Sequence, residues 1–89
     1  MKNEDYIRYF GIVITESSFK NSFAEKLKQI RKEKGITQCD MAMLCSVPAS
    51  TYANWEQGRS EPCLFDILKL ILIFNIDANE LFLVPERSR

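Results

Sequence analysis

Few residues of this chain could carry bond-making or metal-binding chemistry. It has no histidine, and its three cysteines, Cys39, Cys45 and Cys63, lack the paired spacing of zinc ligands. It has no cysteine beside a base and no glycine-rich loop of the kind that cradles phosphate. We therefore expect no enzymatic activity, no metal and no other cofactor, and we predict that the thiols are buried and reduced.

The stretch STYANWEQGRSEP, from Ser50 to Pro62, has a different character. Short side chains fill a helix-length segment beside the only tryptophan, Trp55, and the segment stops at Gly58. A helix face that meets only solvent usually carries long Glu and Lys side chains. Short side chains instead indicate a helix that lies close against another surface.

Composition limits the kind of protein that positions this stretch. The chain has 89 residues, 46% of them hydrophobic and only three of them glycine, which predicts one compact, mostly helical domain. No run approaches the roughly 18–20 apolar residues of a membrane span. Glu4 and Asp5 precede the apolar residues 6–14, which argues against a signal peptide. We expect a cytoplasmic protein without a membrane partner.

Caps, turn residues and apolar spacing predict five helices, over about residues 23–34, 37–45, 48–56, 63–74 and 77–83. Ser22 and Glu25 have capping-box spacing at the start of the first helix, and Gly35 follows its end. Tyr52 and Trp55 are predicted to face inward on the third helix. The later helix starts are marked by Thr37, Pro48, Pro62 and Asp77.

The chain is predicted to divide into three parts. Residues 1–21 are rich in β-branched and aromatic side chains and are predicted to form an extended or strand-like N-terminal arm. Residues 22–84 contain two short helices joined by a three- or four-residue turn, which describes a helix-turn-helix unit. Residues 85–89 form a polar C-terminal tail.

Residues 23–83 resemble the Cro/CI-type (xenobiotic-response-element) helix-turn-helix domain of phage repressors and bacterial regulators. The resemblance is carried by the GITQ entry at residues 35–38, the WEQG exit at residues 55–58, and Pro62 before the fourth helix. It implies an all-α, five-helix repressor-like fold whose third helix enters the major groove of double-stranded DNA. It also implies a sequence-specific transcriptional regulator, with repression as the expected mode.

The resemblance assigns six candidate DNA-binding residues. Gln38 is expected to offer its amide to a phosphate and to brace the third helix, and Arg59 to contact a phosphate from the loop after that helix. The remaining positions face the groove or lie beside it, and are Ala49, Ser50, Thr51 and Asn54. Asn pairs with adenine, Ser with several base edges, and an alanine methyl with thymine.

The sequence departs from the family pattern in three ways, and the last of them bears on affinity. Ser46 replaces the usual turn glycine, which predicts local strain, and Pro48 replaces the usual capping Ser or Thr. Ala49 and Gln57 stand where basic residues are frequent. Because phosphate neutralisation supplies much of the affinity for DNA, we expect a single copy to bind weakly.

Charge supports the same expectation. The formal net charge is zero, which argues against strong non-specific DNA binding. Residues 22–34 are basic, whereas residues 35–61 carry more acidic than basic side chains. The basic side chains of the first segment are Lys26, Lys28, Arg31, Lys32 and Lys34. DNA contacts would need support from the first helix, from a second subunit or from uncharged donors.

The predicted fourth helix is apolar nearly all round. Phe65 and Leu72 are seven residues apart and share a face that the five-helix core does not need. Either the N-terminal arm covers this face or a second subunit does. We favour a homodimer that reads a palindrome through two recognition helices and buries Phe65, Leu72 and the arm.

Two other functions stay open. The stretch NWEQGR also resembles antitoxin members of the family, which bind a toxin and repress their own operon, and the aromatic arm would suit binding of a toxin. The zero net charge also allows a helix-turn-helix module used only for contact with a protein partner.

Overall fold

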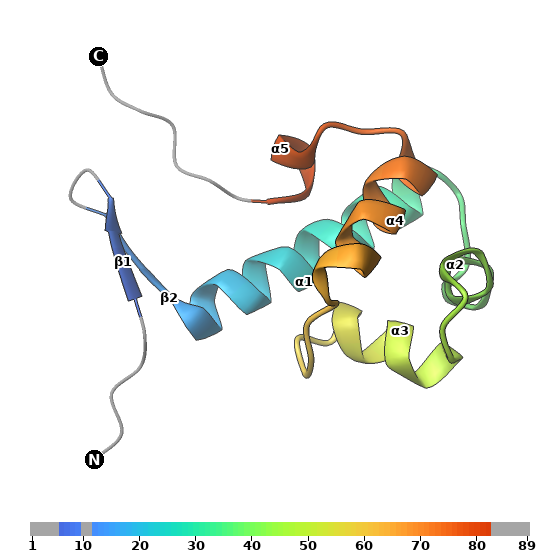
Figure 1. Cartoon of the computed structure of the whole chain (residues 1–89), viewed down its shortest axis with the longest axis horizontal. Coiled ribbons are helices and arrows are strands. Elements are labelled where there is room, and N and C mark those ends of the chain that lie inside the picture. Colours follow the sequence, from blue (N-terminus) through green and yellow to red (C-terminus); the bar gives the residue numbers. More distant parts are fainter. Residues whose placement is uncertain (1–5, 10–11, 83–89) are drawn as a thin grey trace.

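The computed structural model describes residues 6–9 and 12–82, in which a two-stranded sheet is followed by five helices (Figure 1). The elements are β1 (Tyr6–Tyr9), β2 (Ile12–Thr15), α1 (Glu16–Glu33), α2 (Gln38–Cys45), α3 (Ala49–Glu56), α4 (Leu64–Phe74) and α5 (Ala78–Leu81). The predicted five-helix class is confirmed, as is the strand-like character of the arm. The fifth helix ends at Leu81 and Phe82 is extended, so the end predicted at residue 83 is wrong, and the polar tail lies outside the described residues.

The first helix begins earlier than its sequence signals indicated. Thr15 caps α1, because its hydroxyl accepts a hydrogen bond from the backbone N–H of Ser18 at 3.1 Å. The hydroxyl of Ser18 in turn accepts from the N–H of Thr15 at 3.1 Å, which completes a capping box. The start predicted at Ser22 is therefore wrong, and the last residues of the predicted arm belong to the helix.

Aromatic packing explains the longer helix. Phe19 continues the four-residue spacing of Phe23 and Leu27 back toward the N-terminus, so it lies on the same face of α1. Its ring stacks on that of Phe82 with centroids 5.8 Å apart, and Phe23 stacks on Phe82 at 6.0 Å. The residue that follows α5 therefore holds the extra turns of α1 in place.

The hairpin does not reach α4. Strands β1 and β2 pair antiparallel, with Tyr6 opposite Thr15 and Tyr9 opposite Ile12. They lie at the N-terminal end of α1, whereas α4 crosses α1 further along (Figure 1). Phe65 and Leu72 remain 67% and 68% exposed. In the described part of the chain, the hairpin therefore does not cover the face of α4 that carries Phe65 and Leu72.

The core is built from one face of each helix. Within α3, Tyr52 and Trp55 are buried as predicted, with their rings edge to face at 5.7 Å. The core side chains are Phe23, Leu27, Ile30, Met41, Ala42, Cys45, Tyr52, Trp55, Leu70, Phe74 and Leu81.

The three cysteines differ in environment. All are free thiols, and Cys45 is buried as predicted, whereas Cys39 and Cys63 are exposed. The burial predicted for these two is wrong because Cys39 lies in the first turn of α2, away from the core, and Cys63 precedes α4 as its cap. No helix among residues 6–9 and 12–82 is long and apolar enough to cross a membrane.

The turn between α2 and α3 has a left-handed residue. Ser46 has φ 58° and ψ 44°, and its N–H donates to the carbonyl of Met43 at 3.1 Å. The N–H of Val47 donates to the carbonyl of Ala42 at 3.0 Å, which closes the C-terminus of α2. A side chain in this conformation costs roughly 1–2 kcal/mol, so the predicted strain is present.

We predict that Ser46→Gly raises the free energy of unfolding by about 0.5–1 kcal/mol. Glycine removes the left-handed penalty but loses roughly 0.5–1 kcal/mol of backbone entropy on folding, so only part of the penalty is recovered. Urea unfolding measures the change, with Ser46→Ala as the control that keeps a Cβ at this position. A glycine variant no more stable than the alanine variant would show that the turn is unstrained.

Candidate nucleic-acid interface

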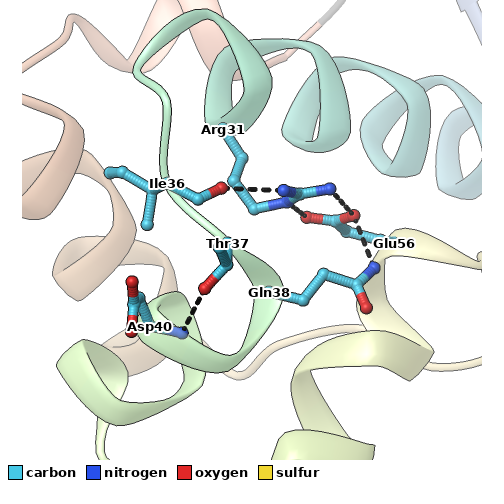
Figure 2. Close-up of polar contacts among 6 residues, drawn as sticks. All are labelled: Arg31, Ile36, Thr37, Gln38, Asp40 and Glu56. Atoms are coloured by element: carbon cyan, nitrogen blue, oxygen red, sulfur yellow. Dashed lines mark hydrogen bonds and ion pairs between the residues drawn. The ribbon is translucent and has the colours of Figure 1, made fainter.

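A buried ion pair joins the first and third helices. The Nε of Arg31 donates to Oε2 of Glu56 at 2.6 Å, and Nη2 donates to Oε1 at 3.2 Å (Figure 2). The Nη1 of Arg31 donates to the carbonyl of Ile36 at 2.8 Å, in the connection between α1 and α2. Glu56 is only 3% exposed. One guanidinium therefore fixes the end of α3 against α1 and the chain that enters α2.

Gln38 adds the second helix to this network. Its Nε2 donates to Oε1 of Glu56 at 2.9 Å, so the first residue of α2 braces the last residue of α3 (Figure 2). Thr37 caps α2 as predicted, accepting from the N–H of Asp40 at 3.1 Å. An amide has two N–H donors. The phosphate contact expected of Gln38 stays a prediction and would use the second of them.

The network sets the charge state of its members. Burial alone would raise the pKa of Glu56, but the hydrogen bonds from Arg31 and Gln38 outweigh it and lower the pKa below its ordinary value. The hydrogen bond to Glu56 likewise raises the pKa of Arg31. Burial, with the nearby Glu56 carboxylate, raises the pKa of Tyr52 far above its ordinary value. The hydroxyl of Tyr52 is buried without a well-formed hydrogen bond among the described residues.

With its inner side fixed, α3 presents small side chains outward. Tyr52, Trp55 and Glu56 are buried, whereas Ala49 and Ser50 are exposed and Thr51 is half-buried. Asn54 is half-buried, like Thr51. Because Asn54 follows Ser50 by four residues, Ser50 and Asn54 lie on the same side of the helix. Pro48 precedes α3 and provides no side-chain capping bond, as predicted.

Arg59 lies next to this helix face. Its side chain is exposed, and its backbone N–H donates to the carbonyl of Asn54 at 3.0 Å. Gly58 allows this turn through its φ of 72°, and a Cβ added there would lie 3.0 Å from Oδ1 of Asn21 on α1. The six candidate residues thus lie at the start of α2, along α3 and in the loop after α3.

The sequence interpretation missed the network itself. Arg31 belongs to the basic run of the first helix, but it is buried and paired, so that side chain is not available to a phosphate. The available signal was its spacing, because Phe23, Leu27 and Arg31 recur every four residues on the buried face of α1. An arginine on an apolar stripe indicates a buried acidic partner. The described residues contain no cluster of potential metal ligands.

We predict that Arg31→Met lowers the free energy of unfolding by about 3–5 kcal/mol at neutral pH, because it leaves a buried carboxylate unpaired. This deficit should shrink on acidification. In the wild type the pKa of Glu56 is lowered by folding, so the stability that the pair contributes is present above the ordinary carboxyl pKa and is lost as pH falls through the lowered one. In the variant, the unpaired Glu56 binds its proton more tightly when folded, so acid stabilises the fold.

Urea unfolding of both proteins from neutral pH to about pH 3 measures this difference. The control is the double variant Arg31→Met/Glu56→Gln, which has no carboxyl group at the site. It should recover part of the loss and show no contribution from Glu56 to the pH dependence. A deficit of Arg31→Met that stays constant with pH would contradict the assignment.

Comparison with known proteins agrees with this geometry. A family model described as a helix-turn-helix domain matches residues 24–87. The chain is 27% identical over 63 residues to the HTH-type transcriptional regulator PuuR of Escherichia coli (strain K12), covering 71% of this chain and 34% of PuuR. It is 33% identical over 57 residues to the prophage-derived HTH-type transcriptional regulator YonR of Bacillus subtilis (strain 168), covering 64% of this chain and 53% of YonR. The chain thus spans about a third of the first relative and about half of the second.

Solved structures share the fold. The restriction-modification controller protein C.AhdI from Aeromonas hydrophila has a TM-score of 0.66 and 32% identity, over 70% of this chain and 94% of that chain. A hydroxypropylphosphonic acid epoxidase from S. wedmorenis has a TM-score of 0.68 at 24% identity, over 74% of this chain and 35% of that chain, which shows the fold alone. The chain belongs to the Cro/CI-type helix-turn-helix family of DNA-binding transcriptional regulators.

Proposed function

We propose that this protein represses transcription by binding a palindromic operator as a homodimer, with α3 in the major groove. One observation carries the proposal. The inner side of α3 is fixed by Tyr52, Trp55 and the ion pair of Glu56, while its outer side presents short side chains. A rigid helix with a low-profile outer face can approach base edges closely.

Base recognition is assigned to the start and middle of α3. Ser50 and Asn54 carry the hydrogen-bonding groups, the methyl of Ala49 suits thymine, and Thr51 lies beside them. Gln38, which contacts the last residue of α3, and Arg59, in the loop after α3, would contact phosphates. Phosphate contacts of this kind fix register and orientation, whereas base contacts determine the preferred sequence.

The proposed dimer interface is an apolar ridge on α4, formed by Leu64, Phe65, Leu68 and Leu72. These four side chains are 85%, 67%, 48% and 68% exposed. Leu64, Leu68 and Leu72 recur every four residues, so they form a continuous stripe along the helix, with Phe65 beside it. A contiguous apolar stripe on a soluble domain marks a contact surface. A second copy would cover it and double the phosphate contacts.

Base recognition predicts that Ser50→Ala and Asn54→Ala each relax preference at one operator position and cost about 1–3 kcal/mol there. The operator is first obtained by selection from random DNA, and no enrichment at all would refute sequence-specific binding. Titrations against all four bases at each position then measure the loss. Asn79→Ala is the control, because Asn79 is exposed on α5, outside the proposed surface. Equal losses of affinity for every DNA sequence would show that these side chains contact only the DNA backbone.

The same titrations distinguish Arg59 from the base-reading residues. Arg59→Ala should weaken binding to every sequence and reduce the dependence of log affinity on log salt by roughly one charge per subunit. An altered base preference with an unchanged salt slope would move Arg59 from the phosphates to the bases.

For the ridge, we predict that Leu72→Lys weakens dimerisation and lowers apparent operator affinity in proportion to the dimer lost, while helix content is kept. The control is Val13→Lys, which places the same charge on a half-exposed apolar position of the hairpin, apart from α4. Sedimentation of the three proteins at micromolar concentration measures dimerisation. A wild-type monomer that still binds its operator tightly would refute the dimer, and a dimer lost only in Val13→Lys would move the interface to the hairpin.

A further inference from the structure

The C-terminus of α2 is capped by a lysine side chain from α4. The last turn of α2 has no basic residue, although the exposed carbonyls and the dipole at a helix C-terminus favour one. The Nζ of Lys69, on α4, donates to the carbonyl of Cys45 at 2.5 Å. Cys45 is the last residue of α2, so Lys69 caps this helix across the interface between α2 and α4.

The Lys69 side chain is itself held on two sides. Its Nζ lies 2.9 Å from Oδ1 of Asp66 and 5.5 Å from the centroid of the Phe65 ring. The hydrogen bond from Lys69 lowers the pKa of Asp66, which therefore stays charged at neutral pH. The other carboxylate oxygen of Asp66 accepts from the thiol of Cys63 at 3.2 Å. These contacts limit the positions that the ammonium group can take.

This contact lies between two surfaces that the proposed function uses. Cys45 directly precedes Ser46, the left-handed residue whose backbone directs the chain into α3. Phe65, on the other side of Lys69, belongs to the exposed ridge. Lys69 therefore contacts both the residue that precedes the turn into α3 and the ring that a second copy would cover.

We propose that Lys69 is a positioning residue that links occupation of the α4 ridge to the orientation of α3. Covering Phe65 would remove water from the ammonium group, whose side chain is 25% exposed, and bonds to charged groups strengthen where water is excluded. The carbonyl of Cys45 and the strained turn after it would then be held more firmly. By linkage, DNA that requires this turn geometry would favour the dimer in return. The link rests on the proposed dimer, whereas the positioning role does not.

Amide hydrogen exchange at Ser46 and Val47 tests the proposal, because their N–H groups close the C-terminus of α2. Lys69→Met should lower protection at these two amides by about tenfold, the lower end of the effect of losing one charge-assisted hydrogen bond, because the ammonium group is partly exposed. Lys69→Arg keeps the charge and the donors, so it should restore most of the protection. Lys34→Met is the matched control, since it makes the same change at an exposed lysine after α1. Circular dichroism verifies that each variant is folded.

The link is measured by repeating the exchange at protein concentrations below and above the dimerisation midpoint. Protection at Ser46 and Val47 should rise with dimerisation in the wild type and stay low in Lys69→Met. Equal protection in Lys69→Met and Lys34→Met would overturn the positioning role. Wild-type protection that is unchanged by dimerisation, or a wild type that never dimerises, would overturn the link. Loss of DNA binding is scored separately by titration, so failure of the proposed function is distinguished from failure of this inference.

Discussion

The buried pair of Arg31 and Glu56 is the contact on which the helix-turn-helix arrangement depends. Removing two charges from water is costly, and the cost is offset only where every donor and acceptor is used. Here the guanidinium donates to both carboxylate oxygens and to the carbonyl of Ile36, while Gln38 donates to the same carboxylate. These bonds are satisfied together only when α1, α2 and α3 have one relative position. The pair therefore specifies geometry more than it adds stability.

That constraint leaves the outer face of α3, the proposed DNA-binding surface, free of any structural role. Because Tyr52, Trp55 and Glu56 hold the helix from within, its outward positions need no long side chains for support. The turn before α3 is strained, because Ser46 adopts a left-handed conformation that glycine would adopt more easily. The hydrogen bonds of Ser46 and Val47 and the lysine from α4 hold this turn. The orientation of α3 thus depends on contacts from α1, α2 and α4.

The sequence predicted the elements whose signals are local. Thr37, Pro48 and Asp77 mark the starts of α2, α3 and α5 within a residue, because caps act over one turn. The start of α1 was missed because Ser22 and Glu25 also have capping-box spacing, and the choice depends on Phe19 meeting Phe82 at the other end of the fold. The local spacing of Arg31 indicates a buried arginine, but its partner Glu56 is 25 residues away and cannot be identified from that spacing. Contacts between residues far apart in the sequence decide where α1 begins and what Arg31 binds, and a short stretch of sequence does not contain both partners.

Two of the cations in this chain form ion pairs within the fold. Arg31 and Lys69 are cations turned inward, each paired with a carboxylate, so they organise the domain and do not neutralise phosphates. The remaining charges also sum to zero, because each pair removes one charge of each sign. A single copy therefore has little general attraction for DNA, and under the proposed dimerisation its affinity would come from well-placed contacts made by both copies. Under the same proposal, operator occupancy would rise steeply with protein concentration in the range where the dimer forms.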